Sequence, residues 1–270
     1  EPGSVLASRN TYKIVSDFFQ FEPLHKILVK GKEAPQEVFK LIRKSDVDSR
    51  IAASAAKGLT RFVGRENTMA ALKEAYEKVT SGSGQVVGIV GEAGVGKSRL
   101  ILEMRNRLSQ DEFNWLEGRC IHYGGSMAYL PILDILKDYF DIKEDDRESD
   151  IKRKMETKIV NLDERLKHTL TPFQELLSVK VDNEDFLQLD PTVKKLRKFE
   201  AIRDVLIRES QNKLLIIVVE DLHWMDKTSG EFLQYLIDSL TGTRIMLILL
   251  YRPEYAHPWG SKTYYTKIGL

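Results

Sequence analysis

The stretch of residues 85–100, QVVGIVGEAGVGKSRL, constrains the fold of this chain more than any other feature. Its first six residues are mostly apolar and β-branched, which is typical of a parallel strand with both faces buried. Residues 91–98 then fit the pattern G-x-x-x-x-G-K-[ST]. The apolar residues that follow recur at helical spacing: Leu100, Ile101, Met104 and Leu108. Strand, glycine loop and helix in this order predict a phosphate-binding loop, and the alternative is an ordinary glycine turn.

This loop supplies the first candidate nucleotide ligands. Its glycines allow backbone N–H groups to turn toward phosphate oxygens at the positive end of the following helix. We expect Lys97 to reach the β- and γ-phosphates of ATP and Ser98 to ligate Mg²⁺. The predicted cofactor-binding residues of the loop are Gly91, Glu92, Ala93, Gly94, Val95, Gly96, Lys97, Ser98 and Arg99.

A second apolar run, residues 214–219, predicts a central strand that ends at two acids, Glu220 and Asp221. Open α/β sheets bind ligands at the carboxyl ends of their strands. One carboxylate is expected to hold Mg²⁺ partly through water, with Glu220 the candidate, and the other to polarise the attacking water. The candidate catalytic residues are therefore Asp221, Glu220 and Lys97. The alternative is an acidic pair that caps the next helix.

A third apolar run, residues 244–250, is followed by Tyr251 and Arg252. If this strand is parallel to its neighbours, Arg252 lies at the same edge and can sense the γ-phosphate. Equally, Arg252 can be a loop residue that precedes Pro253. His223 and Trp224 follow the acidic pair, and we expect them to pack or hydrogen-bond beneath this edge rather than to bind a metal.

The order of several motifs resembles the AAA-type ATPase module of the STAND class, the signal-transduction ATPases with numerous domains. These motifs are FVGRE at 62–66, the glycine loop, LEGRC at 116–120, YLPILDIL at 129–136, VVEDLHWMD at 218–226 and LLYRPEY at 249–255. The resemblance implies a parallel sheet with helices on both faces, slow ATP turnover and helical or repeat domains downstream. It also implies a nucleotide-dependent switch, with a nucleotide-dependent oligomer as a further expectation. In such modules the segment that corresponds to Phe62, Val63, Gly64 and Arg65 lies against the adenine.

The first 44 residues are expected to belong to a different domain. Residues 10–19 predict a short amphipathic helix with Tyr12, Val15 and Phe19 on one side, and residues 24–42 predict a hairpin with a Lys-Gly-Lys turn. Two strands and one helix cannot form a stable core alone. This segment resembles the last elements of a class III nucleotide cyclase catalytic domain, in which Lys30 corresponds to a lysine that approaches the triphosphate. An unrelated hairpin is the alternative.

The resemblance also sets the expected domain boundaries. Residues 1–44 form the end of the cyclase domain, 45–60 a partly helical linker, and 61–270 an ATPase domain truncated at its C-terminus. The cyclase family's metal-binding aspartates, base-recognition residues and transition-state arginine have no counterpart here, so we expect no cyclisation of ATP by this chain. We expect the chain to be a piece of a longer cyclase–ATPase fusion.

Composition excludes several other classes of protein. The net charge of +1 gives no broad basic surface for nucleic acid or an anionic membrane. No apolar run approaches the roughly 20 residues of a membrane-spanning helix. A single cysteine fits a reducing compartment, so a cytoplasmic location is expected. The basic residues at 194–203 alternate with Leu196, Phe199 and Ile202, which indicates an amphipathic core-facing helix rather than a partner-docking patch.

Three functions fit these features. The first is a regulatory ATPase that tunes an attached cyclase. The second is an ATP-binding module with little hydrolysis, because Glu220 takes the place at which an aspartate commonly binds the metal. The third is a transcription or kinase-type regulator with the same ATPase and an N-terminal hairpin unrelated to cyclases. We favour the first.

Overall fold

A computed structural model describes the chain apart from residues 1–2, 29–33, 46–49, 57, 110 and 123–127. The chain divides into two compact units, Glu1–Val63 and Gly64–Leu270. The division places Phe62 and Val63 with the N-terminal unit. Within the described residues, no helix is both long enough and apolar enough to cross a membrane.

The N-terminal unit has a three-stranded antiparallel sheet in the order β1-β3-β2. Helix α1 lies against this sheet, where the ring of Tyr12 stacks on that of Phe39 with 4.0 Å between the centroids. The elements of this unit are β1 (Leu6–Ser8), α1 (Arg9–Val15), β2 (Phe19–Pro23), β3 (Val38–Lys44) and α2 (Arg50–Ala56).

Two expectations for this unit are wrong in detail. The predicted helix ends at Val15, and Phe19 is the first residue of β2 instead of the last of the helix. The hairpin pairs β2 with β3, so its first strand begins earlier than predicted. Nearer the turn, the described residues show a hydrogen bond from the Leu24 N–H to the Val38 carbonyl and an isolated bridge from Ile27 to Gln36. Strand β2 ends at Pro23, which has no N–H to donate to β3. Lys30 lies outside the described residues.

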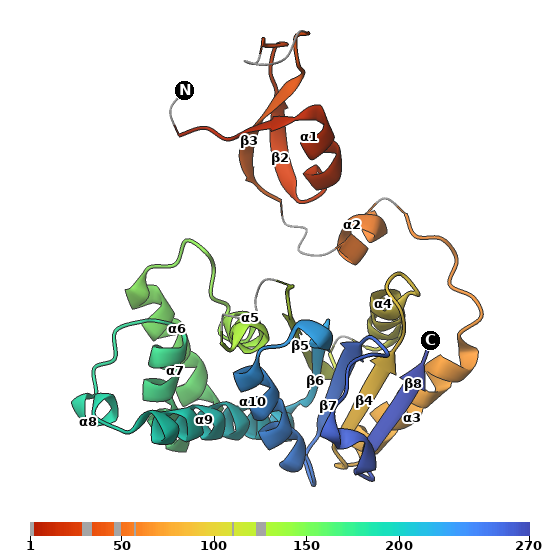
Figure 1. Cartoon of the computed structure of the whole chain (residues 1–270). Helices are drawn as coiled ribbons and strands as arrows, with labels where there is room; N and C mark the ends of the chain where they lie inside the picture. The colour runs from red at the N-terminus through yellow and green to blue at the C-terminus, as the bar shows by residue number, and fades with distance from the viewer. Residues whose placement is uncertain (1–2, 29–33, 46–49, 57, 110, 123–127) are drawn as a thin grey trace. The chain divides into compact units, whose positions relative to one another are not determined.

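The second unit is an α/β domain built on a five-stranded sheet in the order β5-β6-β7-β4-β8, all parallel (Figure 1). The strands are β4 (Gln85–Val90), β5 (Phe113–Arg119), β6 (Leu214–Glu220), β7 (Ile245–Tyr251) and β8 (Tyr265–Gly269). The α-helices are α3 (Glu66–Thr80), α4 (Lys97–Arg107), α5 (Leu130–Tyr139), α6 (Glu148–Leu162), α7 (Leu170–Leu176), α8 (Glu184–Leu187), α9 (Pro191–Asn212) and α10 (Lys227–Asp238). Short 3₁₀ helices are η2 (Glu164–Thr169), η3 (Leu222–Trp224) and η4 (Pro258–Ser261).

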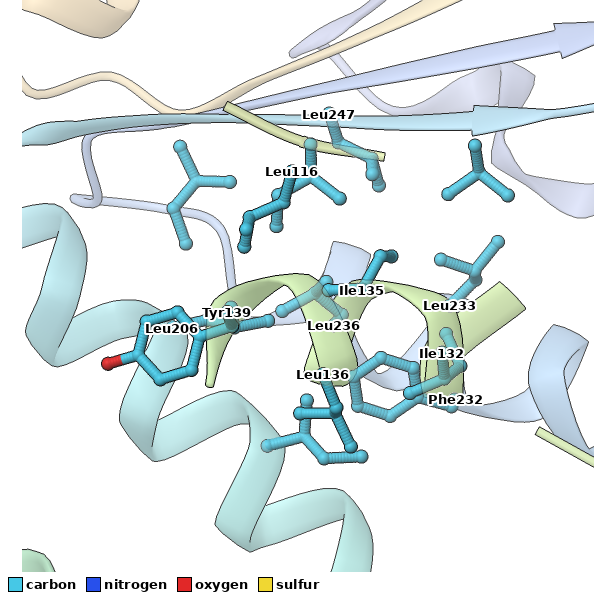
Figure 2. Close-up of a cluster of buried hydrophobic side chains, with 14 of the residues drawn as sticks. Leu116, Ile132, Ile135, Leu136, Tyr139, Leu206, Phe232, Leu233, Leu236 and Leu247 are labelled. Carbon is cyan, nitrogen blue, oxygen red and sulfur yellow. The ribbon is translucent and has the colours of Figure 1, made fainter. Parts of the chain in front are cut away.

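The three central strands β6, β7 and β4 are buried almost throughout, because helices cover both faces of the sheet. On one face, Ile132 and Ile135 of α5 and Leu236 of α10 pack against Leu116 and Leu247 of the sheet (Figure 2). On the other face, α3 contacts β4, β7 and β8 and also contacts α4. This confirms the predicted three-layer fold with a parallel sheet.

The region between β5 and β6 is largely helical. Met155 and Ile159 lie in α6 and Leu166 lies in η2, because α6 ends before Asp163, whose side chain accepts a hydrogen bond from the Arg165 N–H and caps η2. The basic segment forms part of α9, and Phe199 and Ile202 are buried in the core.

A polar cluster lies within the sheet beside β4. The hydroxyls of Tyr251 and Tyr265 are 2.5 Å apart, and Nε2 of His257 is 2.8 Å from the first and 3.1 Å from the second. Gly88 of β4 makes room for this cluster, because a Cβ atom there would lie 2.1 Å from the Tyr265 hydroxyl and 2.8 Å from the Tyr251 hydroxyl. Nδ1 of His257 accepts a hydrogen bond from the Trp259 N–H, so the imidazole is neutral with its proton on Nε2.

Candidate functional site

The glycine loop connects the end of β4 to the beginning of α4. Gly94 and Gly96 have φ angles of 82° and 98°, a left-handed conformation that side chains disfavour. The ammonium group of Lys97 donates to the carbonyl oxygens of Gly91 and Glu92 at 2.6 and 2.9 Å. The lysine is therefore folded back into the loop, and these two carbonyls fix its position. Ser98 is half-buried in the first turn of α4.

All strands of this sheet are parallel, so their carboxyl ends meet at one edge. The loop follows β4, Glu220 ends β6, and Arg252 directly follows β7. The Gly91 N–H donates to the Tyr251 carbonyl at 3.2 Å, which places the beginning of the loop beside Arg252. The structure thus brings the loop, both acids and Arg252 to one edge.

Glu220 is joined to Arg119, the last residue of the neighbouring strand β5. Nε and Nη2 of Arg119 donate to the same oxygen of Glu220, Oε2, at 3.1 and 2.6 Å. Only 12% of the Glu220 side chain is exposed, compared with 36% for Arg119. Arg119 is not among the site residues that the sequence predicts. The available signal was its place at the end of residues 113–119, but Asn114 and Glu117 interrupt the apolar pattern of that strand.

Asp221 begins the turn after β6. Its φ angle of 59° is left-handed, a conformation that aspartate tolerates better than most residues. Its carbonyl accepts the Trp224 N–H at 2.9 Å, which closes η3. No hydrogen bond to the Asp221 carboxylate is found within the part of the chain that the structure describes, in contrast to the paired Glu220 carboxylate.

The charges of this edge act on Lys97. Burial lowers the pKa of the Lys97 ammonium, Asp221 opposes this effect, and Arg252 adds to it by repulsion. Glu92 and Glu220 also favour the charged form. Lys97 therefore lies within the field of both acids and of Arg252, so charges of both signs meet at the glycine loop.

Arg252 lies against the ring of Trp224, with its guanidinium carbon 5.5 Å from the ring centroid. Its nearest acidic partner in an ion pair, Glu254, is 3.9 Å away. His223 packs on Trp224 with 4.5 Å between ring centroids. Burial and the charge of Arg252 lower the pKa of His223, and among the described residues neither ring nitrogen has a hydrogen-bond partner.

Of the remaining predicted ligands, some contact the glycine loop and others do not. Nη2 of Arg65 donates to the Val95 carbonyl at 3.3 Å, so Arg65 reaches the glycine loop. Gly64 has a φ angle of 74°, as its place in a turn requires. Arg99 forms an ion pair with Glu103 at 2.5 Å along α4. Phe62 and Val63 belong to the N-terminal unit, and their adenine contact stays a prediction.

Cys120, the single cysteine of the chain, directly follows Arg119. Its N–H donates to the Glu220 carbonyl at 3.0 Å, and its side chain is 1% exposed. Burial, reinforced by Asp226 and Asp221, raises the pKa of its thiol to about 12. The thiol is thus held in its protonated form beside the acidic edge.

Comparison with known proteins assigns the second unit. The model of the AAA ATPase domain family matches residues 61–249. The chain is also 26% identical over 274 residues to the uncharacterized protein R02095 of Rhizobium meliloti (strain 1021). That match covers 100% of this chain and 26% of the relative, so the chain spans about a quarter of the relative's length. The family match includes the loop, both acids and most of the sheet, and the chain belongs to the AAA ATPase domain family.

Proposed function

We propose that residues 61–270 form a nucleotide-dependent regulatory ATPase of the STAND class, which binds ATP at residues 91–98 and hydrolyses it slowly. Membership of the AAA ATPase family implies ATP binding. The observation that carries the proposal is the convergence of Lys97, Asp221 and Arg252 at one sheet edge, where the two charges act on the pKa of Lys97. Occupancy of the site can shift the arrangement of attached domains only through contacts that differ between nucleotide states.

The side chains present fit a complex of ATP with Mg²⁺. Ser98 would hold the metal directly. Glu220 would hold it through water by its other carboxylate oxygen, because Oε2 already accepts two hydrogen bonds from Arg119. The metal would supply positive charge that offsets the charge of the β- and γ-phosphates. Lys97, released from its loop carbonyls, would bind the same phosphates, and the carboxylate of Asp221 would orient and polarise water.

We further propose that the N-terminal unit is the end of a class III cyclase domain and that the ATPase regulates that domain in a longer signalling protein. The unit has a helix followed by an antiparallel hairpin, although the helix is shorter and the first strand earlier than the sequence predicts. The large apolar side chains Ile14, Leu28 and Ile42 of this unit are exposed. The remainder of a larger domain would cover such side chains. The length of the relative is consistent with further domains in such a protein.

A binding-only module is the second candidate, and the pair formed by Arg119 and Glu220 favours it. Two hydrogen bonds from a cation reduce the capacity of Glu220 to hold a metal. Single-turnover release of phosphate separates the two candidates. A hydrolysing site releases more phosphate in the wild type than in Asp221→Asn, whereas a binding-only site gives equal background in both.

The test of the nucleotide site is the variant Lys97→Ala, with Lys73→Ala on the exposed face of α3 as the matched control. Removing a charge-assisted phosphate contact costs about 1.5–3 kcal/mol, or about tenfold or more in affinity. Isothermal titration calorimetry with Mg·ATP should show this loss in Lys97→Ala and none in Lys73→Ala. Equal affinity in both variants would refute the site.

A further inference from the structure

Trp224 lies at the centre of a contact chain across the carboxyl edge of the sheet. Its ring meets that of His122, which follows β5, edge-to-face at 5.4 Å between centroids. On the other side it meets the guanidinium of Arg252, which follows β7, at 5.5 Å. Trp224 itself ends η3, directly after β6. One indole therefore connects the ends of three neighbouring strands.

The position of this indole is set by the turn that also places Asp221. The left-handed backbone of Asp221 turns the chain away from β6, and the bond from the Trp224 N–H to the Asp221 carbonyl closes η3. After η3, Asp226 caps α10 by accepting from the N–H and the hydroxyl of Ser229 at 2.9 and 2.5 Å. The short segment between β6 and α10 is thus fixed at both ends.

Among the described residues, the side chain of Arg252 contacts the indole of Trp224 and forms one ion pair, with Glu254. Its ion pair with Glu254 is long, and the Glu254 side chain is 61% exposed, so that pair restrains Arg252 weakly. Arg252 also lies close enough to Lys97 to repel it: the pKa of Lys97 is lowered mainly by burial and in part by the charge of Arg252. The electron-rich face of the indole offers the guanidinium a favourable position despite that repulsion.

We propose that Trp224 is a positioning residue that holds the Arg252 guanidinium where it contacts the terminal phosphate of a nucleoside triphosphate, and so sets the preference of the site for ATP over ADP. This inference rests on the proposed function. ADP has no γ-phosphate, so an arginine held for that group stabilises the triphosphate complex alone. Loss of the indole leaves Arg252 with more conformations, which weakens triphosphate binding and spares diphosphate binding.

The experiment measures dissociation constants for Mg·ADP and for a magnesium complex of a non-hydrolysable ATP analogue by calorimetry. The variants are Trp224→Leu, Trp224→Phe, Arg252→Ala and the double variant Trp224→Leu/Arg252→Ala. The matched control is Trp115→Leu, because Trp115 makes the same kind of contact with Arg105, at 5.1 Å, in the middle of β5.

In Trp224→Leu, the ratio of the ADP constant to the analogue constant should fall by about threefold to tenfold, the range that a cation–π contact provides. Trp224→Phe should give a smaller fall, since a phenyl ring retains part of the attraction. Arg252→Ala should lower the ratio at least as far as Trp224→Leu does. The double variant should lower it no further than Arg252→Ala alone. Trp115→Leu should leave the ratio unchanged.

Equal weakening of both nucleotides in Trp224→Leu would overturn the inference, because it indicates a general structural role. If Trp224→Leu does not fold, Trp224→Phe takes its place. The inference is then overturned if the ratio is unchanged in Trp224→Phe while it is lowered in Arg252→Ala. Failure of the proposed function is distinguishable. In that case Lys97→Ala binds the analogue as tightly as the wild type, whatever the Trp224 variants do.

Discussion

The guanidinium of Arg119 donates two hydrogen bonds to one oxygen of Glu220, and this ties the last residue of β5 to the last residue of β6. The outer strand of the sheet is thereby joined to the strand that ends at Glu220 and is followed by Asp221. The remaining oxygen of Glu220 is the one that can serve a metal, so the same pair also limits how Glu220 can act.

Removing this arginine should destabilise the domain. Arg119→Ala leaves a largely buried carboxylate without its cation, and we expect a loss of about 0.5–1.5 kcal/mol in the free energy of unfolding. The comparison is Arg153→Ala, whose ion pair with Asp150 is 3.3 Å long and exposed on both sides, and which should change stability by less than about 0.5 kcal/mol. Urea unfolding measures both. Equal losses in the two variants would show that the pair of Arg119 and Glu220 stabilises the domain no more than an exposed ion pair does.

Asp221→Asn should lower single-turnover release of phosphate by about tenfold or more, within the range of a general acid–base contribution. Asparagine tolerates the left-handed backbone at this position, so the turn and η3 should persist. The control, Asp238→Asn, changes an exposed acid at the other end of α10. Phosphate release equal to that of the wild type would remove Asp221 from the catalytic group.

Gly88→Ala should lower the free energy of unfolding by about 1–3 kcal/mol, the usual cost of overpacking a core. The new methyl group would overlap the hydroxyls of Tyr251 and Tyr265. Gly260→Ala is the control, because among the described residues a Cβ there meets no atom within 4 Å beyond its own chain neighbours. Combining Gly88→Ala with Tyr265→Phe should recover part of the loss in urea unfolding. No loss in Gly88→Ala would mean that the tyrosines shift freely.

Acid should destabilise the domain through His257. Burial lowers the pKa of this imidazole, and the nearby charge of Lys267 adds to the effect. The unfolded chain therefore binds the proton first, so stability is full above the ordinary histidine pKa of about 6.5 and falls as the pH decreases below it. One such site contributes at most about 1.4 kcal/mol per pH unit.

Urea unfolding at several pH values between 5 and 8 measures this dependence. His257→Gln removes the titrating group, and the wild type should lose more stability than this variant as the pH falls. The pKa of His223 is also lowered, so a part of the dependence should remain in His257→Gln. Identical pH profiles of the two proteins would contradict the assignment of a neutral imidazole to His257.

The sequence predicts the central part of this fold well, because the three inner strands are continuous apolar runs and the glycine loop has a fixed local context. The outer strands are different. In β5 only Phe113, Leu116 and Gly118 are buried, and in β8 only Ile268, so neither segment has the pattern of a buried strand. Their place in the sheet depends on pairing with residues far along the chain.

The same reason explains what the sequence did not reveal about the site. Local sequence patterns predict Lys97, Glu220 and Asp221 as site residues, since each belongs to a pattern of strand and turn. The partnership of Arg119 with Glu220 joins residues 101 positions apart, and the contact of Arg252 with Trp224 depends on the order of the strands. In the N-terminal unit, Leu24 and Leu28 are apolar yet exposed, so the apolar pattern places the first hairpin strand too late in the chain.

Because Cys120 is buried, the rate at which a thiol reagent labels it can report local opening of the domain. Thiol reagents attack the thiolate, and both the enclosure of this side chain and its raised pKa suppress that form. Modification must then wait for the edge between β5 and β6 to open, so the labelling rate reports the frequency of that opening. Because the chain has one cysteine, a single mass shift records the event without any engineered probe.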